Sequence, residues 1–210
     1  MKTLLNYTLI FLLFLSSCKK EDTIQAVTAG IYDSSFTYHE FSPSIKVELT
    51  LDTSTDNYLG SDSIDINQDG AYDLIISQRI HIPPTSGIPS FEQFPYCRLI
   101  LRNGLEVATK IEYYSVGHGQ YDDVNWVDTL NYENRIENIS DWSGSNVVCT
   151  MWAIPPVPYG VSYGPWYFPT NEMKYIGIRM KIGSRYKYGW IKVNEISHED
   201  MLFLGLALEK

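Results

Sequence analysis

The sequence has few positive charges and no helical periodicity. Sixteen Lys and Arg residues stand against 25 Asp and Glu residues, which gives a formal net charge of -9. Because an acidic chain repels phosphate backbones, nucleic acid is not an expected partner. No stretch repeats apolar residues at helical spacing over three turns, so we expect strands rather than helices to build the core.

Motifs of common catalytic sites are also missing. The four histidines lie far apart, without the His-Glu-x-x-His or His-x-His spacing of catalytic zinc. The letters of residues 160–164 match Gly-x-Ser-x-Gly, but Pro158 and Pro165 stand where a nucleophile elbow requires a strand and a helix. The sequence therefore favours a binding protein over an enzyme.

One enzymatic alternative stays open, a carbohydrate-active hydrolase that uses two carboxylates. Such a pair is defined by distance in space, so the sequence alone does not select it. The candidates are Glu92, Glu106, Glu112 and Asp123.

The first 18 residues predict where the protein is located. Lys2 precedes an apolar run from Leu9 to Leu15, which is too short to span a membrane and is typical of a secretory signal. The run ends in Leu-Ser-Ser-Cys, which resembles the lipobox of bacterial lipoproteins. The resemblance implies that residues 1–17 are a signal peptide and that Cys18 carries the lipid that anchors the protein to the membrane.

The residues after Cys18 refine this location. Lys-Lys-Glu-Asp at 19–22 resembles the short signal that sends lipoproteins of some Gram-negative lineages to the outer face of the outer membrane. It implies an outer-membrane protein at the cell surface, with the periplasmic face as the alternative. Residues 18–30 are mostly small and polar, and we expect a tether there.

Residues 31–210 predict one all-β domain, a single antiparallel β-sandwich. Apolar residues alternate from Ile45 to Leu51 and along 74–82, as in half-buried strands. Asn103-Gly104 predicts a type I′ turn within a hairpin at 98–107. A second hairpin is expected at 175–193 around Gly183-Ser184, and it resembles the C-terminal hairpin of uncharacterised secreted bacterial β proteins with an Asp-rich loop, which brings no known activity.

Two cysteines remain besides Cys18. Cys97 alternates with Leu99 and Leu101, and Cys149 alternates with neighbouring apolar residues, so both are expected to face the core. An even pair in an exported protein is consistent with a disulfide. Two buried free thiols are the alternative, since free cysteine is often buried.

The segment from Asp65 to Asp73 is a candidate calcium loop. Calcium takes six to eight oxygen ligands, and a tightly coiled loop turns alternate residues inward around a glycine, here Gly70. The segment resembles the DxDxDG loops of EF-hands, dockerins and β-propeller and adhesin repeats, but Ile76 replaces the glutamate at the twelfth position of an EF-hand. The expected ligands of a structural Ca2+ are Asp65, Asn67, Asp69, the Ala71 carbonyl and Asp73. An Asx-rich turn without an ion is the alternative.

Aromatic residues gather between Trp152 and Pro169. Flat rings stack on sugar rings, so Tyr159, Tyr163 and Trp166 are candidate glycan-binding residues; the alternative is that they cap the core. If Gly183-Ser184 forms a two-residue loop, Arg179 faces Tyr188 in a second, basic and aromatic face. We therefore expect a calcium-stabilised binding or adhesion module for a glycan or a surface protein, with a hydrolase or a structural partner of a surface complex as alternatives.

Overall fold

The computed structural model describes residues 27–81, 96–117, 120–136, 139–145, 147–153, 161–163, 173–196 and 201–210. Within these residues the chain forms strands and turns but no helix, so the all-β prediction is confirmed and no described helix could cross a membrane. The strands are β1 (Phe36–Lys46), β2 (Thr50–Asp52), β3 (Asn57–Ile64), β4 (Leu74–His81), β5 (Tyr96–Leu101), β6 (Leu105–Gly117), β7 (Gln120–Val127), β8 (Trp142–Ser143), β9 (Val147–Ala153), β10 (Val161–Tyr163), β11 (Lys174–Ile182), β12 (Arg185–Ile196) and β13 (Met201–Glu209).

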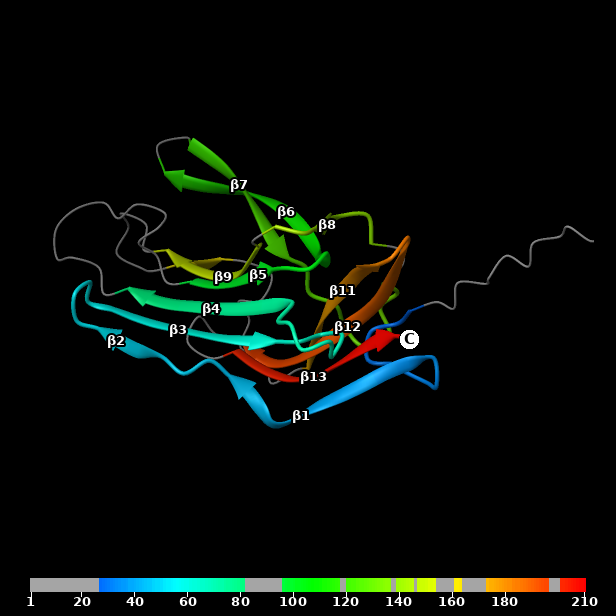
Figure 1. Cartoon of the computed structure of the whole chain (residues 1–210). Helices are drawn as coiled ribbons and strands as arrows, with labels where there is room; N and C mark the ends of the chain where they lie inside the picture. The colour runs from blue at the N-terminus through cyan, green and yellow to red at the C-terminus, as the bar shows by residue number, and fades with distance from the viewer. Residues whose placement is uncertain are drawn as a thin grey trace, which may run out of the picture.

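The strands join into one curled sheet in the order β1-β13-β12-β11-β6-β7-β9-β5-β4-β3-β2. The long strand β6 connects the two halves, because its start pairs with β11 and its remainder pairs with β7. Figure 1 shows the halves as two layers, with the far part of the β6–β7 hairpin projecting beyond them. The layers of the expected sandwich are thus halves of one half-barrel sheet, which is mixed because β7 and β9 meet in parallel.

The main core lies between these two halves. Alternate residues of each strand point inward, as the period-two patterns predict. Leu74 and Ile76 of β4 and Leu99 of β5 are fully buried on one side, and Ile178 of β11 and Phe203 of β13 are fully buried on the other. Each such side chain contributes roughly 1.5–3 kcal/mol of burial free energy, which makes this layer the main source of stability.

A second, smaller core covers the outer face of β11–β13. Trp190 of β12 lies beneath Val27, Ala29 and Ile136, all of them buried. The Ile136 amide donates to the Val27 carbonyl at 2.8 Å. The expected tether at 18–30 therefore does not extend to its last four residues. Residues 27–30 belong to the domain, because Val27 and Ala29 complete this core.

The turn predicted at Asn103-Gly104 forms, but the hairpin around it does not. Both residues adopt positive φ, 55° and 77°, and the Leu105 amide donates to the Arg102 carbonyl. Strand β5 already pairs with β4 on one edge and β9 on the other, so β6 leaves it and pairs with β11. The turn is a corner between the two halves of the sheet.

The second predicted hairpin is confirmed, and its register is the one expected for a two-residue loop. Gly183-Ser184 is a two-residue loop between β11 and β12, Ile182 faces Arg185, and Arg179 faces Tyr188. The neighbouring pair across the same hairpin is Lys181 and Tyr186.

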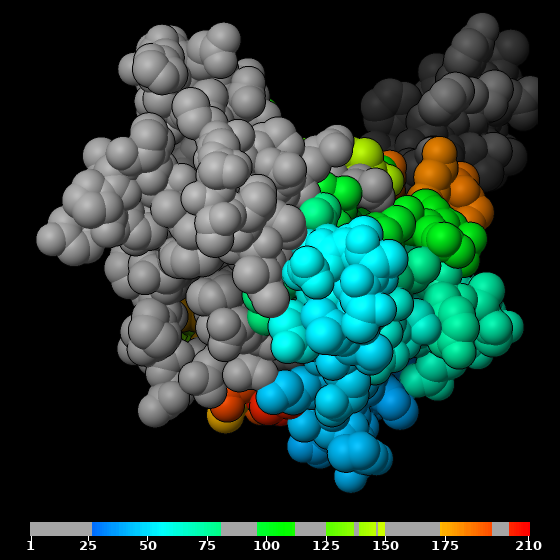
Figure 2. Space-filling view, turned by 90° about the vertical axis from the view of Figure 1, so that its left-hand side faces the viewer, coloured from blue at the N-terminus to red at the C-terminus, as the bar shows by residue number. Residues whose placement is uncertain are grey.

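The single strand expected from Ile45 to Leu51 is wrong. Strand β1 ends at Lys46 and β2 begins at Thr50, and these are the two edge strands at opposite ends of the sheet order. Residues 47–49 carry the chain from one half of the sheet to the other, with Val47 buried, so the apolar alternation continues across a crossover. Figure 2 shows the β2–β3 hairpin (cyan) on the exposed end of the molecule, with part of β1 (blue) below it.

Candidate functional site

The Asp-rich loop at 65–73 joins β3 to β4 and is coiled by its own side chains. The Asp65 carboxylate accepts hydrogen bonds from the amides of Asp69 (3.2 Å) and Gly70 (2.8 Å). The side-chain oxygen of Asn67 accepts a hydrogen bond from the Asp69 amide at 2.9 Å, and the Asp69 carboxylate accepts one from the Ala71 amide at 2.9 Å. Gly70 has a φ of 93°, which fits the sharp turn expected at the sixth position.

Asp73 differs from the other acidic residues of the loop because it is fully buried. Its Oδ2 accepts from the amides of Ile66 (2.9 Å) and Asn67 (3.4 Å), and its Oδ1 accepts from the Asn103 side-chain amide at 3.0 Å. The Asp73 carbonyl also accepts from the Arg102 amide. Asp73 therefore fastens the loop to the Asn103-Gly104 corner.

The loop presents Asp65, Asn67 and Asp69 oxygens at its partly or fully exposed surface. Each of these side chains accepts at least one backbone hydrogen bond, which fixes its orientation. No group of three or more His, Cys, Asp or Glu side chains stands ready to hold a metal in the described part of the chain. A calcium site here would use the Asn67 oxygen and backbone carbonyls beside the two exposed carboxylates.

A cluster around Arg179 occupies the outer face of β6, β8, β11 and β12. Its members are Glu106, Trp142, Arg179, Tyr186 and Tyr188. The Arg179 guanidinium lies 4.7 Å from the centre of the Trp142 ring and 4.4 Å from that of Tyr186. Its Nε donates to Glu106 at 2.7 Å, so the charge is paired as well as stacked.

The rings of the Arg179 cluster are held in place by further contacts. Tyr188 meets Trp142 edge to face at 5.9 Å, and the Trp142 indole N–H donates to the Ile139 carbonyl. The Tyr186 hydroxyl donates to Glu106 at 2.9 Å, and this hydrogen bond raises the pKa of Tyr186 above its ordinary value. Tyr186 remains 36% exposed, so the cluster is ordered and also open to a ligand.

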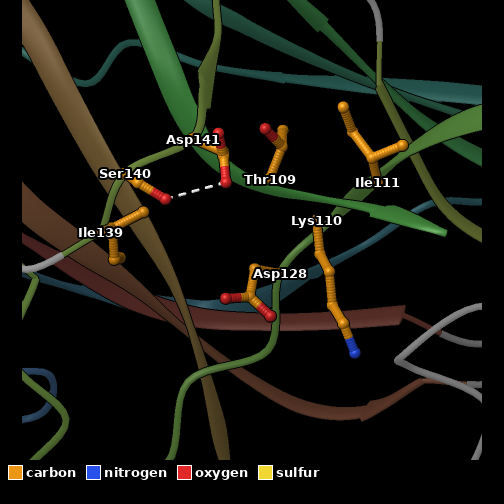
Figure 3. Close-up of a pocket in the computed structure, with 7 residues that line it drawn as sticks. All are labelled: Thr109, Lys110, Ile111, Asp128, Ile139, Ser140 and Asp141. Carbon is orange, nitrogen blue, oxygen red and sulfur yellow. Dashed lines mark hydrogen bonds between the residues drawn. The ribbon is translucent and has the colours of Figure 1, made fainter.

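A shallow cavity of about 420 Å³ lies beside β6, between the segments that follow β7 and precede β8. Figure 3 shows Lys110, Asp128, Ser140 and Asp141 around it. The Ser140 hydroxyl donates to the Asp141 carboxylate at 2.8 Å. Two carboxylates therefore border one cavity with an amine nearby, a charge arrangement that suits polar rather than apolar ligands.

The two core cysteines lie on adjacent strands and are buried. Cys97 lies on β5 and Cys149 on β9, both with no exposed surface, as their alternation predicts. Burial raises the pKa of the Cys149 thiol well above its usual range, and a hydrogen bond with Cys97 adds to the shift. The Cys149 thiol is therefore not poised for nucleophilic catalysis, since the thiolate is the reactive form.

Several predicted site residues lie outside the described residues. These are the lipidation residue Cys18, the aromatic residues Tyr159 and Trp166, and the carboxylate candidate Glu92. Tyr163 ends β10, where its backbone pairs with Met151 of β9, and the backbones of Glu112 and Asp123 lie in the β6–β7 hairpin. Both carboxylate oxygens of Glu106 accept hydrogen bonds, one from Arg179 and one from Tyr186.

Trp142, Asp128 and Asp141 were not predicted as ligand-binding or catalytic residues. Trp142 lies on the two-residue strand β8, 37 residues before Arg179, and only the fold brings them together. The segments that carry Asp128 and Asp141 are far apart in the sequence, and the fold places both of them beside β6, where the two side chains border one cavity. The part of the site that was predicted, Arg179 with Tyr186 and Tyr188, depended on a local hairpin register.

Comparison with known proteins assigns no relation. No family model matches the chain, and neither a curated protein nor a solved structure matches it.

Proposed function

We propose that this chain is a lipid-anchored binding or adhesion module of the outer membrane that faces the cell surface and takes a glycan as its ligand. The lipobox residues ending at Cys18 and the lysine-plus-acid segment after it support the location. A structural Ca2+ in the loop at 65–73 is part of the proposal, and its support is the spacing of oxygen-bearing side chains along this tightly turned loop. A surface protein is the alternative ligand.

The observation that carries the binding role is the Arg179 cluster. Free aromatic side chains lose conformational entropy when a ligand orders them, and rings that are already ordered avoid that cost. The stacked guanidinium and the edge-to-face contact hold Trp142, Tyr186 and Tyr188 in fixed orientations. Fixed rings beside a paired carboxylate and guanidinium offer both stacking surface and hydrogen-bonding groups to a sugar.

The test is a glycan-array screen of the protein, followed by titration of any ligand found. Trp142→Ala removes one ring of the Arg179 cluster and is expected to weaken binding at least about tenfold. Trp166→Ala tests the aromatic segment in the same way, and Tyr72→Ala is a control because Tyr72 is an exposed aromatic residue that is not a member of the cluster. A folded protein that binds no glycan on the array would overturn the glycan assignment and favour a structural partner in a surface complex.

A second candidate function, a carbohydrate-active hydrolase, is favoured by the cavity beside β6. Retaining and inverting glycosidases place two carboxylates around the scissile bond, and Asp128 and Asp141 both border this cavity. The experiment is turnover of the glycans that the array identifies. Loss of turnover in both Asp128→Asn and Asp141→Asn, with binding retained, would support the hydrolase, whereas equal turnover in the variants would exclude it.

A further inference from the structure

The register between β5 and β9 brings Cys97 and Cys149 to one point of the sheet. Leu99 pairs with Val147 and Arg98 pairs with Val148, so the next step along both strands is Cys97 beside Cys149. The ladder bulges at this step, where Cys97 pairs with Thr150 and Cys149 becomes the inserted residue. A bulge places two residues opposite one, so both Cys149 and Thr150 stand across from Cys97.

The side chains of the two cysteines point to the same side of the sheet. Both are fully buried in the main core, as are their strand neighbours Leu99 and Val147. The Cys97 thiol also contributes to the raised pKa of the Cys149 thiol, as expected for neighbouring groups. Adjacent strands and a shared buried face are conditions under which a disulfide forms without moving the backbone far.

The surroundings of the pair are not purely apolar. Gln78 of β4 pairs with Cys97 across the next ladder and is buried, with only 1% of its surface exposed. Neither the nitrogen nor the oxygen of its side-chain amide has a hydrogen-bond partner. A buried polar group without a hydrogen-bond partner costs free energy, so the side chain beside the thiols is not explained by apolar packing alone.

We propose that Cys97 and Cys149 are a disulfide site, oxidised by exchange with a disulfide-bearing oxidant such as glutathione disulfide or a thiol–disulfide oxidoreductase. One protein thiolate attacks a sulfur of the oxidant and forms a mixed disulfide. The second thiolate then attacks the protein sulfur of that mixed disulfide and expels the oxidant's second sulfur. The protein loses two protons and two electrons, and the S–S bond of the oxidant is reduced to two thiols.

The bond joins β5 to β9 and encloses β6, β7 and β8 between its two ends. Because both sulfurs are buried in the folded chain, exchange takes place while the chain folds or when the β5–β9 ladder opens. Encounter with an oxidant in the cell rests on the proposed export, whereas the pairing itself does not. The experiment therefore supplies the oxidant.

The full chain is reduced, unfolded and refolded in detergent with a glutathione redox buffer, and remaining thiols are alkylated before digestion with trypsin. Cleavage after Arg79, Arg98, Arg135 and Lys174 places Cys97 in the peptide 80–98 and Cys149 in the peptide 136–174. The expected product is these two peptides joined, at least about tenfold in excess over either peptide recovered in alkylated form. Recovery of both peptides mainly in alkylated form would overturn the proposal.

A register control separates a specific site from chance oxidation. The double variant Val148→Cys, Cys149→Ser moves the thiol by one residue, which turns it to the opposite face of the sheet. It is expected to lose the joined peptides while its other cysteines alkylate fully. If the double variant joins Cys97 to the peptide 136–174 to the same extent as the natural chain, the register between β5 and β9 does not determine which cysteines pair.

A last measurement distinguishes failure of the disulfide site from failure of the proposed export. Protein recovered from the membrane of cells grown in air is alkylated and digested in the same way. Joined peptides after refolding but alkylated peptides from cells would leave the site intact and contradict export to an oxidising compartment. Joined peptides in both preparations would support both proposals.

Discussion

At the scale of single residues, Asp73 has a structural role that is separate from any metal. Its buried carboxylate receives hydrogen bonds from two loop amides and from Asn103. Asp69 belongs to the same loop but is exposed and accepts from Ala71 at the surface. Two acidic residues that look equivalent in the motif are therefore expected to behave differently when they are replaced.

We expect Asp73→Ala to lower the free energy of unfolding by about 3 kcal/mol even in the presence of a chelator, because buried donors lose their acceptor. The control Asp69→Ala, measured in chelator, should cost less than about 1 kcal/mol. Urea denaturation followed by tryptophan fluorescence measures both. Equal losses for the two variants would contradict the structural role of Asp73.

The phenol of Tyr186 provides a test of the Arg179 cluster at the same scale. Its pKa is raised chiefly by the hydrogen bond to Glu106, so the stabilising contribution is complete below the ordinary pKa of a phenol and is lost as the pH rises through the higher folded value. Carbon NMR of labelled tyrosine should show Tyr186 among the last to ionise. In Glu106→Gln its titration should move back toward the ordinary value, and an unchanged titration would rule out Glu106 as the cause.

At the scale of elements, the β12–β13 ladder leaves no room at Gly189. A Cβ added there would lie 2.0 Å from the carbonyl oxygen of Ala207, which belongs to the backbone of the partner strand. Gly183 in the β11–β12 loop has a φ of 64° and no atom within 4 Å of an added Cβ. The two glycines are thus required for different reasons, one for space and the other for backbone conformation.

We expect Gly189→Ala to destabilise the domain by about 3 kcal/mol, because the two strands must separate locally to admit the methyl group. Gly183→Ala should cost about 1 kcal/mol, the penalty for placing an L-residue in the left-handed region. Thermal unfolding followed by circular dichroism compares the two variants. A smaller effect at Gly189 than at Gly183 would show that the strands adapt without cost.

The elements also show what the sequence could and could not predict. The β11–β12 hairpin was predictable, but its register followed only on the condition that Gly183-Ser184 forms a two-residue loop, as it does. The Asn103-Gly104 turn was equally clear, yet β5 and β6 part after it, because both edges of β5 are taken by strands from distant parts of the chain. Local turn chemistry determines where the chain reverses, whereas competition between strands for edges determines which ones pair.

At the scale of the whole molecule, the curled sheet has two cores, and the Arg179 cluster packs against the outer one through Trp142 and Tyr188. The inner core follows from alternating patterns that are visible in the sequence. The outer core does not, because Val27 and Ala29 stand in a segment whose composition resembles a tether. The same limit applies to the Arg179 cluster, since Trp142 reaches it through the pairing of β8 with β6.

The calcium proposal is best tested on the whole domain, because the loop at 65–73 is tied through Asp73 and Asn103 to the corner that joins the two halves of the sheet. An ion that binds only the folded chain stabilises it by about 2.7 kcal/mol when its concentration is 100 times the dissociation constant. For a domain of this size that corresponds to a rise in Tm of about 5–10 °C.

The expected result is a fall in Tm on adding chelator and full recovery with calcium. Asp69→Ala should abolish the calcium response while it leaves the Tm in chelator almost unchanged, since Asp69 is exposed and its oxygens contribute little to the ion-free fold. Magnesium is the ionic control, because its smaller octahedral shell suits a loop built for more oxygens poorly. If neither chelator nor calcium changes the Tm of the natural chain, the loop is an Asx-rich turn without an ion. The hydrogen bonds that Asp65, Asn67 and Asp73 already make would then hold it together.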